Sequence, residues 1–127
     1  MRILLEVERT ALAATLEDTA VARDFAALLP LDLSLDDYAA TEKIAYPPRK
    51  LTMAGAPRGT AAAAGDICYY APWGNLALFY RDSGHAKGLV RLGRLDDRNR
   101  VDALRRPGPL RVKIETVKTG PERIEDT

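Results

Sequence analysis

The chain is poor in the side chains that most often build metal centres and disulfides. Its 127 residues include one cysteine, Cys68, and one histidine, His85. A single cysteine excludes an internal disulfide and a cysteine-rich zinc site, and a single histidine excludes a pair of histidine ligands. We therefore expect no metal and no other cofactor. No residue set predicts a catalytic site either, because His85 has no assignable nucleophile partner and Cys68, beside aromatic residues, is interpreted as a small packing residue.

The sequence also lacks long apolar segments and an excess of one charge. No run approaches the roughly 20 apolar residues that a membrane-spanning helix needs. Glutamates within the first eight residues interrupt the apolar core that a signal peptide requires. Lysine and arginine total 19 against 18 aspartate and glutamate, which gives no electrostatic footprint for nucleic acid. We expect a cytoplasmic protein that binds neither membranes nor nucleic acids.

Short segments in which apolar and polar residues alternate predict β-strands. Leu31, Leu33 and Leu35, for example, alternate with Asp32 and Ser34. The alanine run at 60–64 and the polar, glycine-containing segment 82–88 are interpreted as loops. The strands are expected at residues 2–8, 12–16, 31–35, 42–46, 66–71, 76–81, 88–95 and 110–117.

Two helices interrupt the strands. The first follows Asp18 or Thr19, either of which can cap it, and ends at Pro30, which has no N–H to donate. The second follows the adjacent carboxylates Asp96 and Asp97, which are interpreted as caps, as are Asp36 and Asp37. The residues expected to be buried on the two helices are Val21, Phe25, Leu28, Leu29, Leu95, Val101 and Leu104.

The order of elements predicts the fold class. Strands come in runs joined by short turns, which favours an antiparallel sheet, and about eight strands with only two helices favour closure into a barrel. We therefore expect a mainly β protein, a closed and mostly antiparallel barrel of about eight strands capped by two α-helices. By length it is one domain, at residues 1–117, followed by a frayed polar tail at 118–127.

The hairpin at residues 65–81 carries most of the aromatic residues and hardly alternates. Both faces of both strands bear large apolar groups, although a barrel core needs only one face. Three interpretations stay open for the second face: a segment within 36–64 covers it, it forms a groove for a ligand or peptide, or it forms a homodimer interface. Trp73 in the turn is either a packing residue over the barrel end or a binding platform.

These residues resemble the bacterial cyclophilin-like fold families. The resemblance spans residues 1–117 and rests on T-L-E-D-T-A-V-A-R-D-F-A-A-L-L-P (15–30), G-D-I-C-Y-Y-A-P-W-G-N-L-A-L-F-Y (65–80) and R-L-G-R-L (91–95). It implies a closed barrel of about eight strands with two helices. It also implies that Ile67, Tyr69, Ala77 and Phe79 lie in the core, whereas Cys68, Tyr70, Leu76, Leu78 and Tyr80 face outward, with Trp73 at the end of that face.

True cyclophilins are peptidyl-prolyl isomerases with a groove on the outer barrel wall. Their groove uses an arginine preceded by Phe-His, a Phe-Met-x-Gln strand and a later Gln-Phe-Phe strand. In this chain residues 38–51 contain no Phe-His-Arg, Arg49 stands between proline and lysine, and Leu76 occupies the glutamine position. Leucine offers no polar anchor for a substrate backbone. The resemblance therefore implies binding without isomerase activity.

We predict an uncharacterised cyclophilin-like protein that binds a small molecule or peptide on its outer wall without catalysis. Two alternatives remain, a degenerate prolyl isomerase that uses Arg49 or Arg91, and a structural homodimer through the same apolar face. Arg91, beside the outer face of the hairpin, is also interpreted as an anion partner or as one half of a salt bridge, and His85 as a solvated residue of a glycine-rich loop. The expected binding residues are Tyr70, Trp73, Leu76, Leu78, Tyr80, His85 and Arg91.

Overall fold

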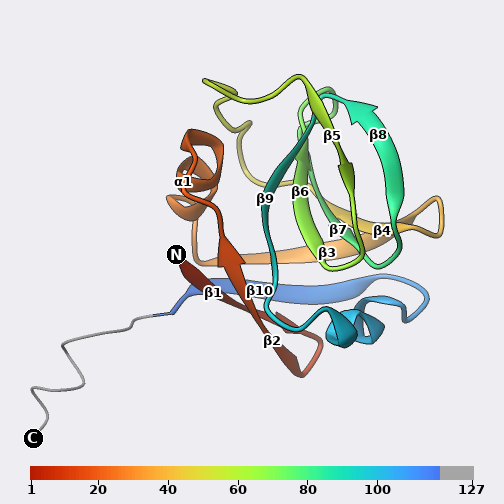
Figure 1. Ribbon diagram of the computed structural model, residues 1–127. Coiled ribbons are helices and arrows are strands. Elements are labelled where there is room, and N and C mark those ends of the chain that lie inside the picture. Colours follow the sequence, from red (N-terminus) through yellow and green to blue (C-terminus); the bar gives the residue numbers. More distant parts are fainter. Residues whose placement is uncertain (118–127) are drawn as a thin grey trace, which may run out of the picture.

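The computed structural model describes residues 1–117, so the expectation for the tail at 118–127 lies outside the described residues. Eight strands form one closed barrel in the order β1-β10-β3-β4-β7-β6-β9-β2, and every neighbouring pair is antiparallel (Figure 1). The predicted fold class is confirmed. The barrel strands are β1 (Arg2–Val7), β2 (Thr10–Leu16), β3 (Leu31–Tyr38), β4 (Glu42–Ala45), β6 (Asp66–Tyr70), β7 (Asn75–Phe79), β9 (Leu89–Leu95) and β10 (Leu110–Thr116).

Two helices add side chains to the barrel core from opposite sides (Figure 1). Helix α1 (Ala20–Ala26) begins at Thr19, whose hydroxyl accepts from the Ala22 N–H. It ends earlier than predicted, so Leu28 and Leu29 follow it as partly buried residues packed on the core. The second helix, η1 (Arg98–Leu104), has the tighter 3₁₀ form and is capped by the Asp97 carboxylate.

A second, two-stranded sheet lies outside the barrel. Strands β5 (Gly59–Ala62) and β8 (Ser83–Lys87) pair antiparallel, and Figure 1 shows them arched beside β6 and β7. Both segments were expected to be loops, and that expectation is wrong. Neither has a strong strand pattern by itself; each becomes a strand by pairing with the other. Ala62 and Ala86 pack on Cys68, Ala77 and Phe79, so this ribbon covers much of the outer face of the hairpin.

The face predicted for the hairpin is right on β6 and wrong on β7. Ile67 pairs with Leu78 and Tyr69 with Leu76, and residues directly opposite in a ladder share a face. Leu76, Leu78 and Tyr80 therefore belong to the barrel core, whereas Ala77 and Phe79 lie under the outer ribbon. The alternation of strands makes a one-residue shift exchange the two faces completely. The pattern could not decide, because 75–80 is apolar on both faces.

Within the described residues, no helix is long and apolar enough to cross a membrane.

Candidate functional site

The turn between β6 and β7 presents Trp73 at the surface. The Gly74 N–H donates to the Tyr70 carbonyl, 2.8 Å away, and Gly74 has a φ of 73°. The Pro72 ring is seated on Gly88, where a Cβ atom would come within 2.7 Å of Pro72 Cδ. Glycine at 88, with a φ of 88°, is what allows this close approach. The indole of Trp73 is left 50% exposed.

A second turn brings Tyr38 to the same place. The chain reverses between β3 and β4 through Ala39 and Ala40, which both have positive φ, and the Thr41 N–H donates to the Tyr38 carbonyl. The ring centroids of Tyr38 and Trp73 lie 5.4 Å apart with an interplanar angle of 86°. Tyr70 meets Trp73 in the same way, at 5.5 Å and 81°. Trp73 thus stands nearly perpendicular to a tyrosine ring from β3 and another from β6.

Beneath these rings lies a cavity of about 220 Å³ between the barrel wall and the outer ribbon, which we call the outer-wall cavity. Leu89 and Phe79 from the barrel and Ala86 from β8 supply apolar surface. Its complete lining is Tyr38, Glu42, Tyr70, Trp73, Asn75, Phe79, Ser83, Ala86 and Leu89. An apolar pocket with a few convergent polar groups is the usual form of a small-molecule site.

Glu42 is the acidic group of this cavity. It pairs with Phe79 across the β4–β7 ladder and shares its outward face. Within residues 1–117, no side chain or amide donates a hydrogen bond to its carboxylate, and no cation forms an ion pair with it. Burial raises the pKa of Glu42 above its ordinary value, because the charged carboxylate loses water without gaining a partner.

The neighbouring Lys43 points the opposite way and is completely buried. Its Nζ donates to the carbonyls of Arg106, 2.6 Å away, and Gly108, 2.9 Å away, and lies 2.9 Å from Asp37 Oδ2. The Tyr80 hydroxyl donates to the other Asp37 oxygen at 2.9 Å. These contacts hold the pKa of Asp37 below its usual range, chiefly through Lys43, while burial and Asp37 raise the pKa of Tyr80. Anchoring Lys43 inward fixes Glu42 outward.

Asn75 is the second polar group of the cavity and is only 1% exposed. Its Nδ2 donates to the Leu76 carbonyl at 3.0 Å, which fixes the orientation of the amide. Its Oδ1 is left without a hydrogen-bond partner among the described residues. A buried acceptor without a donor costs roughly 1–3 kcal/mol. A donor that reached this oxygen would remove that cost.

A family model described as the cyclophilin-like family matches residues 5–115. The chain belongs to the cyclophilin-like family. The solution structure of a hypothetical protein from Archaeoglobus fulgidus is similar to this cyclophilin-like domain, with a TM-score of 0.65, 17% identity, and coverage of 92% of this chain and 95% of that one. At this identity the likeness shows the fold alone. No curated protein matches the chain.

The resemblance inferred from the motifs is thus confirmed at the level of family and fold, whereas a bacterial source is not. Of the expected binding residues, the structure of the cyclophilin-like domain brings Tyr70 and Trp73 together at the outer-wall cavity. Leu76, Leu78 and Tyr80 are corrected to the core, for the register reason given above. These three side chains therefore do not line the outer wall.

His85 and Arg91 also lie away from the outer-wall cavity. His85 is exposed on β8, where its neighbours Ser83 and Ala86 line the cavity and it does not. Arg91 donates from Nε to Glu17 Oε2 at 2.5 Å, and its Nη1 lies 4.0 Å from Asp66 Oδ2. Of the two interpretations of Arg91, the salt bridge is the one that the structure shows.

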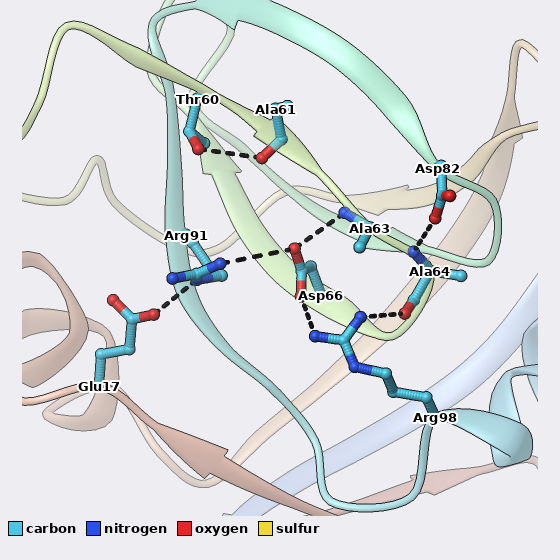
Figure 2. Close-up of polar contacts among 9 residues, drawn as sticks. All are labelled: Glu17, Thr60, Ala61, Ala63, Ala64, Asp66, Asp82, Arg91 and Arg98. Carbon is cyan, nitrogen blue, oxygen red and sulfur yellow. Dashed lines mark hydrogen bonds and ion pairs between the residues drawn. The ribbon is translucent and has the colours of Figure 1, made fainter.

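Figure 2 shows that Arg91 belongs to a cluster around buried Asp66. Asp66 Oδ2 accepts from the Ala63 N–H at 2.9 Å, and Arg98 Nη2 lies 3.7 Å from Oδ1. Arg98 also donates to the Ala64 carbonyl at 3.2 Å. The cluster ties the segment after β5 to β6, β9 and η1, and it therefore holds the outer ribbon against the barrel.

Arg49 is likewise committed to a structural contact. Its guanidinium makes two hydrogen bonds to Asp24, at 2.8 and 2.9 Å, and the Thr52 N–H donates to the same carboxylate at 2.7 Å. These bonds lower the pKa of Asp24 from 3.8 to about 2, and those from Arg49 have the largest effect. Cys68 is buried under the outer ribbon, and desolvation raises the pKa of its thiol, so it is no nucleophile.

The sequence did not single out seven of the nine cavity residues as functional: Tyr38, Glu42, Asn75, Phe79, Ser83, Ala86 and Leu89. Alternation along 42–45 would have placed Glu42 on one face of a strand. It would not have shown what covers that face. No cluster of three or more histidine, cysteine, aspartate or glutamate side chains in residues 1–117 is placed to hold a metal ion.

Proposed function

We propose that this cyclophilin-like domain binds a small organic ligand in the outer-wall cavity. The observation that carries the proposal is the mouth of the cavity, where Tyr38 and Trp73 are 44% and 50% exposed although both are large and apolar. Aromatic surface of this size stabilises a protein when it is covered, at ~25 cal/mol per Å². A ligand lying between these rings and the cavity floor would cover it.

The volume limits the ligand. Pockets that enclose drug-sized compounds measure about 300–1,000 Å³, and this cavity holds about 220 Å³. We therefore propose a metabolite of a few heavy atoms or a single side chain of a peptide. Because the outer ribbon forms one wall through Ser83 and Ala86, the ligand would contact both sheets.

The test uses Trp73, the sole tryptophan, as a fluorescent reporter. A panel of small neutral, anionic and cationic compounds and short peptides is titrated into the full chain. We expect saturable changes in emission from at least one class, retained in Tyr46→Ala, an exposed tyrosine outside the cavity lining, and weakened in Tyr38→Ala. Absence of any change, in fluorescence and in the amide resonances of the cavity, would contradict the proposal.

The isomerase alternative receives no support from the arginines on which it depends. Arg49 is bound to Asp24 and Arg91 to Glu17, and neither lines the outer-wall cavity. A rate increase in a proline-peptide assay, lost in Arg49→Ala or Arg91→Ala, would revive it. Sedimentation tests the homodimer alternative, since a monomer at tens of micromolar leaves Tyr38 and Trp73 uncovered and available to a ligand.

A further inference from the structure

Three aromatic rings line one side of the outer-wall cavity in an arrangement suited to a cation. Tyr38 and Tyr70 each meet Trp73 nearly at right angles, so the rings form adjoining walls rather than a flat stack. The face of an aromatic ring carries negative potential and attracts ammonium groups within about 6 Å of its centroid. Rings that close on one space from different sides add their attraction for the same cation.

Glu42 supplies the counter-charge beside Tyr38, its partner across the β3–β4 ladder. Within the described residues it has no cationic partner, and the cavity lining contains neither lysine nor arginine. Desolvation is the main cause of the raised pKa values of Cys68 on β6 and of Tyr80 just after β7, and the charge of Glu42 adds a smaller contribution to both. Asp37 is committed to Lys43 and to the Tyr80 hydroxyl, and no carboxylate of residues 1–117 other than Glu42 lines the cavity. Glu42 is therefore the acidic group that a cation entering the cavity would meet.

The remaining polar groups favour a cation that carries N–H bonds. Asn75 Oδ1 is an acceptor without a donor among residues 1–117, and the Ser83 hydroxyl also lines the cavity. A quaternary ammonium brings no donor, whereas a primary ammonium brings three. Such a group could satisfy Glu42 and Asn75 while the rings contact the rest of its charge.

We infer that the outer-wall cavity recognises a primary alkylammonium group, held by Glu42 and Asn75 and enclosed by Tyr38, Tyr70 and Trp73. The inference rests on the proposed function and names the ligand class. An alkylammonium is available from a free amine or from a lysine side chain of a peptide. The two sources share this chemistry and differ only in what lies beyond the alkyl chain.

Three probes of similar bulk test the inference by amide chemical-shift titration of the full chain. They are n-butylammonium, neutral 1-butanol, and tetramethylammonium, which has charge but no N–H. We expect n-butylammonium to bind with shifts at Glu42, Trp73 and Asn75. We expect 1-butanol to bind at least about tenfold more weakly, and tetramethylammonium with intermediate affinity. N-acetyl-lysine amide, compared with n-butylammonium, distinguishes a peptide source from a free amine.

Matched variants assign the effect to the cavity. Glu42→Gln is expected to lower n-butylammonium affinity about tenfold or more with little effect on 1-butanol, whereas Glu115→Gln, an exposed glutamate on β10, leaves both unchanged. Tyr38→Ala is expected to weaken the binding of n-butylammonium, and Tyr46→Ala is expected to leave it unchanged. If Glu42→Gln folds poorly, the comparison of Tyr38→Ala with Tyr46→Ala still tests whether the cation binds in the cavity.

The alkylammonium inference is overturned if 1-butanol binds as tightly as n-butylammonium, if Glu42→Gln leaves their ratio unchanged, or if neither probe binds. None of these results removes the proposed function by itself. Suppose that a neutral or anionic compound of the panel binds and that Tyr38→Ala weakens this binding. The cavity would then still be a ligand site, and only the assignment to a cation would be excluded. Failure of the whole panel would remove both.

Discussion

Replacing Lys43 by methionine tests how the barrel positions its outer-wall cavity. Methionine keeps the length of the buried stem and removes the ammonium, which is bound by Asp37 and by two carbonyls of the segment between η1 and β10. Loss of one partner from a fully buried ion pair costs about 3–5 kcal/mol. Asp37 is 39% exposed and can be hydrated after the change. The cost is therefore smaller than for a fully buried pair, and we expect a loss of about 2–3 kcal/mol.

The loss is measured by urea unfolding followed by circular dichroism. For a domain of this length, a loss of ~1 kcal/mol lowers the Tm by roughly 3–5 °C, so the Tm of Lys43→Met should be about 6–15 °C below that of the wild type. Lys113→Met is the matched control: Lys113 is exposed on β10, where the same substitution should change stability by about 0.5 kcal/mol or less. A second readout is the pKa of Asp37, which should rise toward its ordinary value of 3.8 once Lys43 no longer lowers it.

If Lys43→Met unfolds at the wild-type urea concentration and Asp37 titrates as before, the inward position of Lys43 is refuted. The consequence extends to the cavity. Alternation along β4 means that Glu42 faces outward only while Lys43 faces inward. A strand free to shift by one residue would exchange the two, and n-butylammonium binding would be lost together with stability.

Three further predictions concern the supports of the fold. Asp24→Asn removes the ionic contact with Arg49. Because the pKa of Asp24 is lowered from 3.8 to about 2, its carboxylate stabilises the folded state above pH 3.8, and this contribution disappears as the pH falls toward 2. Wild type and variant should thus differ in urea midpoint near neutral pH and converge in strong acid. Gly88→Ala, which strains a positive φ and strikes the proline ring of the β6–β7 turn, should cost about 1–3 kcal/mol and shift tryptophan emission. Its control Gly84→Ala has nothing within 4 Å of the new Cβ and should stay near wild-type stability. Glu42 binds its proton more tightly in the folded state, so stability should fall as pH rises above 4.5, and Glu42→Gln should remove that fall in a pH series of urea midpoints.

Local patterns in the sequence predicted most of the barrel correctly because its strands alternate. In β3 and β10 leucine, valine and isoleucine alternate with polar residues, so burial of one face determines the orientation of each strand. The helix starts were also readable to within one residue, since a side-chain acceptor there satisfies a free N–H of the first turn. The sequence offered Asp18 or Thr19 and Asp96 or Asp97, and the structure uses the second of each pair. By contrast, Asp37 resembled a cap but lies in β3, where it pairs with Lys43 across the β3–β4 ladder and accepts from the hydroxyl of Tyr80, which is distant along the chain.

The two strands of the outer ribbon were predicted to be loops, and the reason for this error is physical. Residues 59–62 and 83–87 are small or polar and have no strand pattern that would favour them in isolation. Each is a strand because the other supplies its hydrogen bonds, and because Ala62 and Ala86 cover Phe79. Such pairing is a property of the folded molecule, and β-propensity depends strongly on that context.

By itself, the sequence determined the class of fold, the family, and the presence of an apolar hairpin with more aromatic surface than a core requires. Only the tertiary structure decided which face of β7 is inside, because a strand apolar on both faces is oriented by the register of its partners. It also decided where a ligand could lie. Tyr38 and Glu42 are partners in the β3–β4 hairpin, and Trp73, distant along the chain, joins them only because the β6–β7 turn lies on the same side of the barrel.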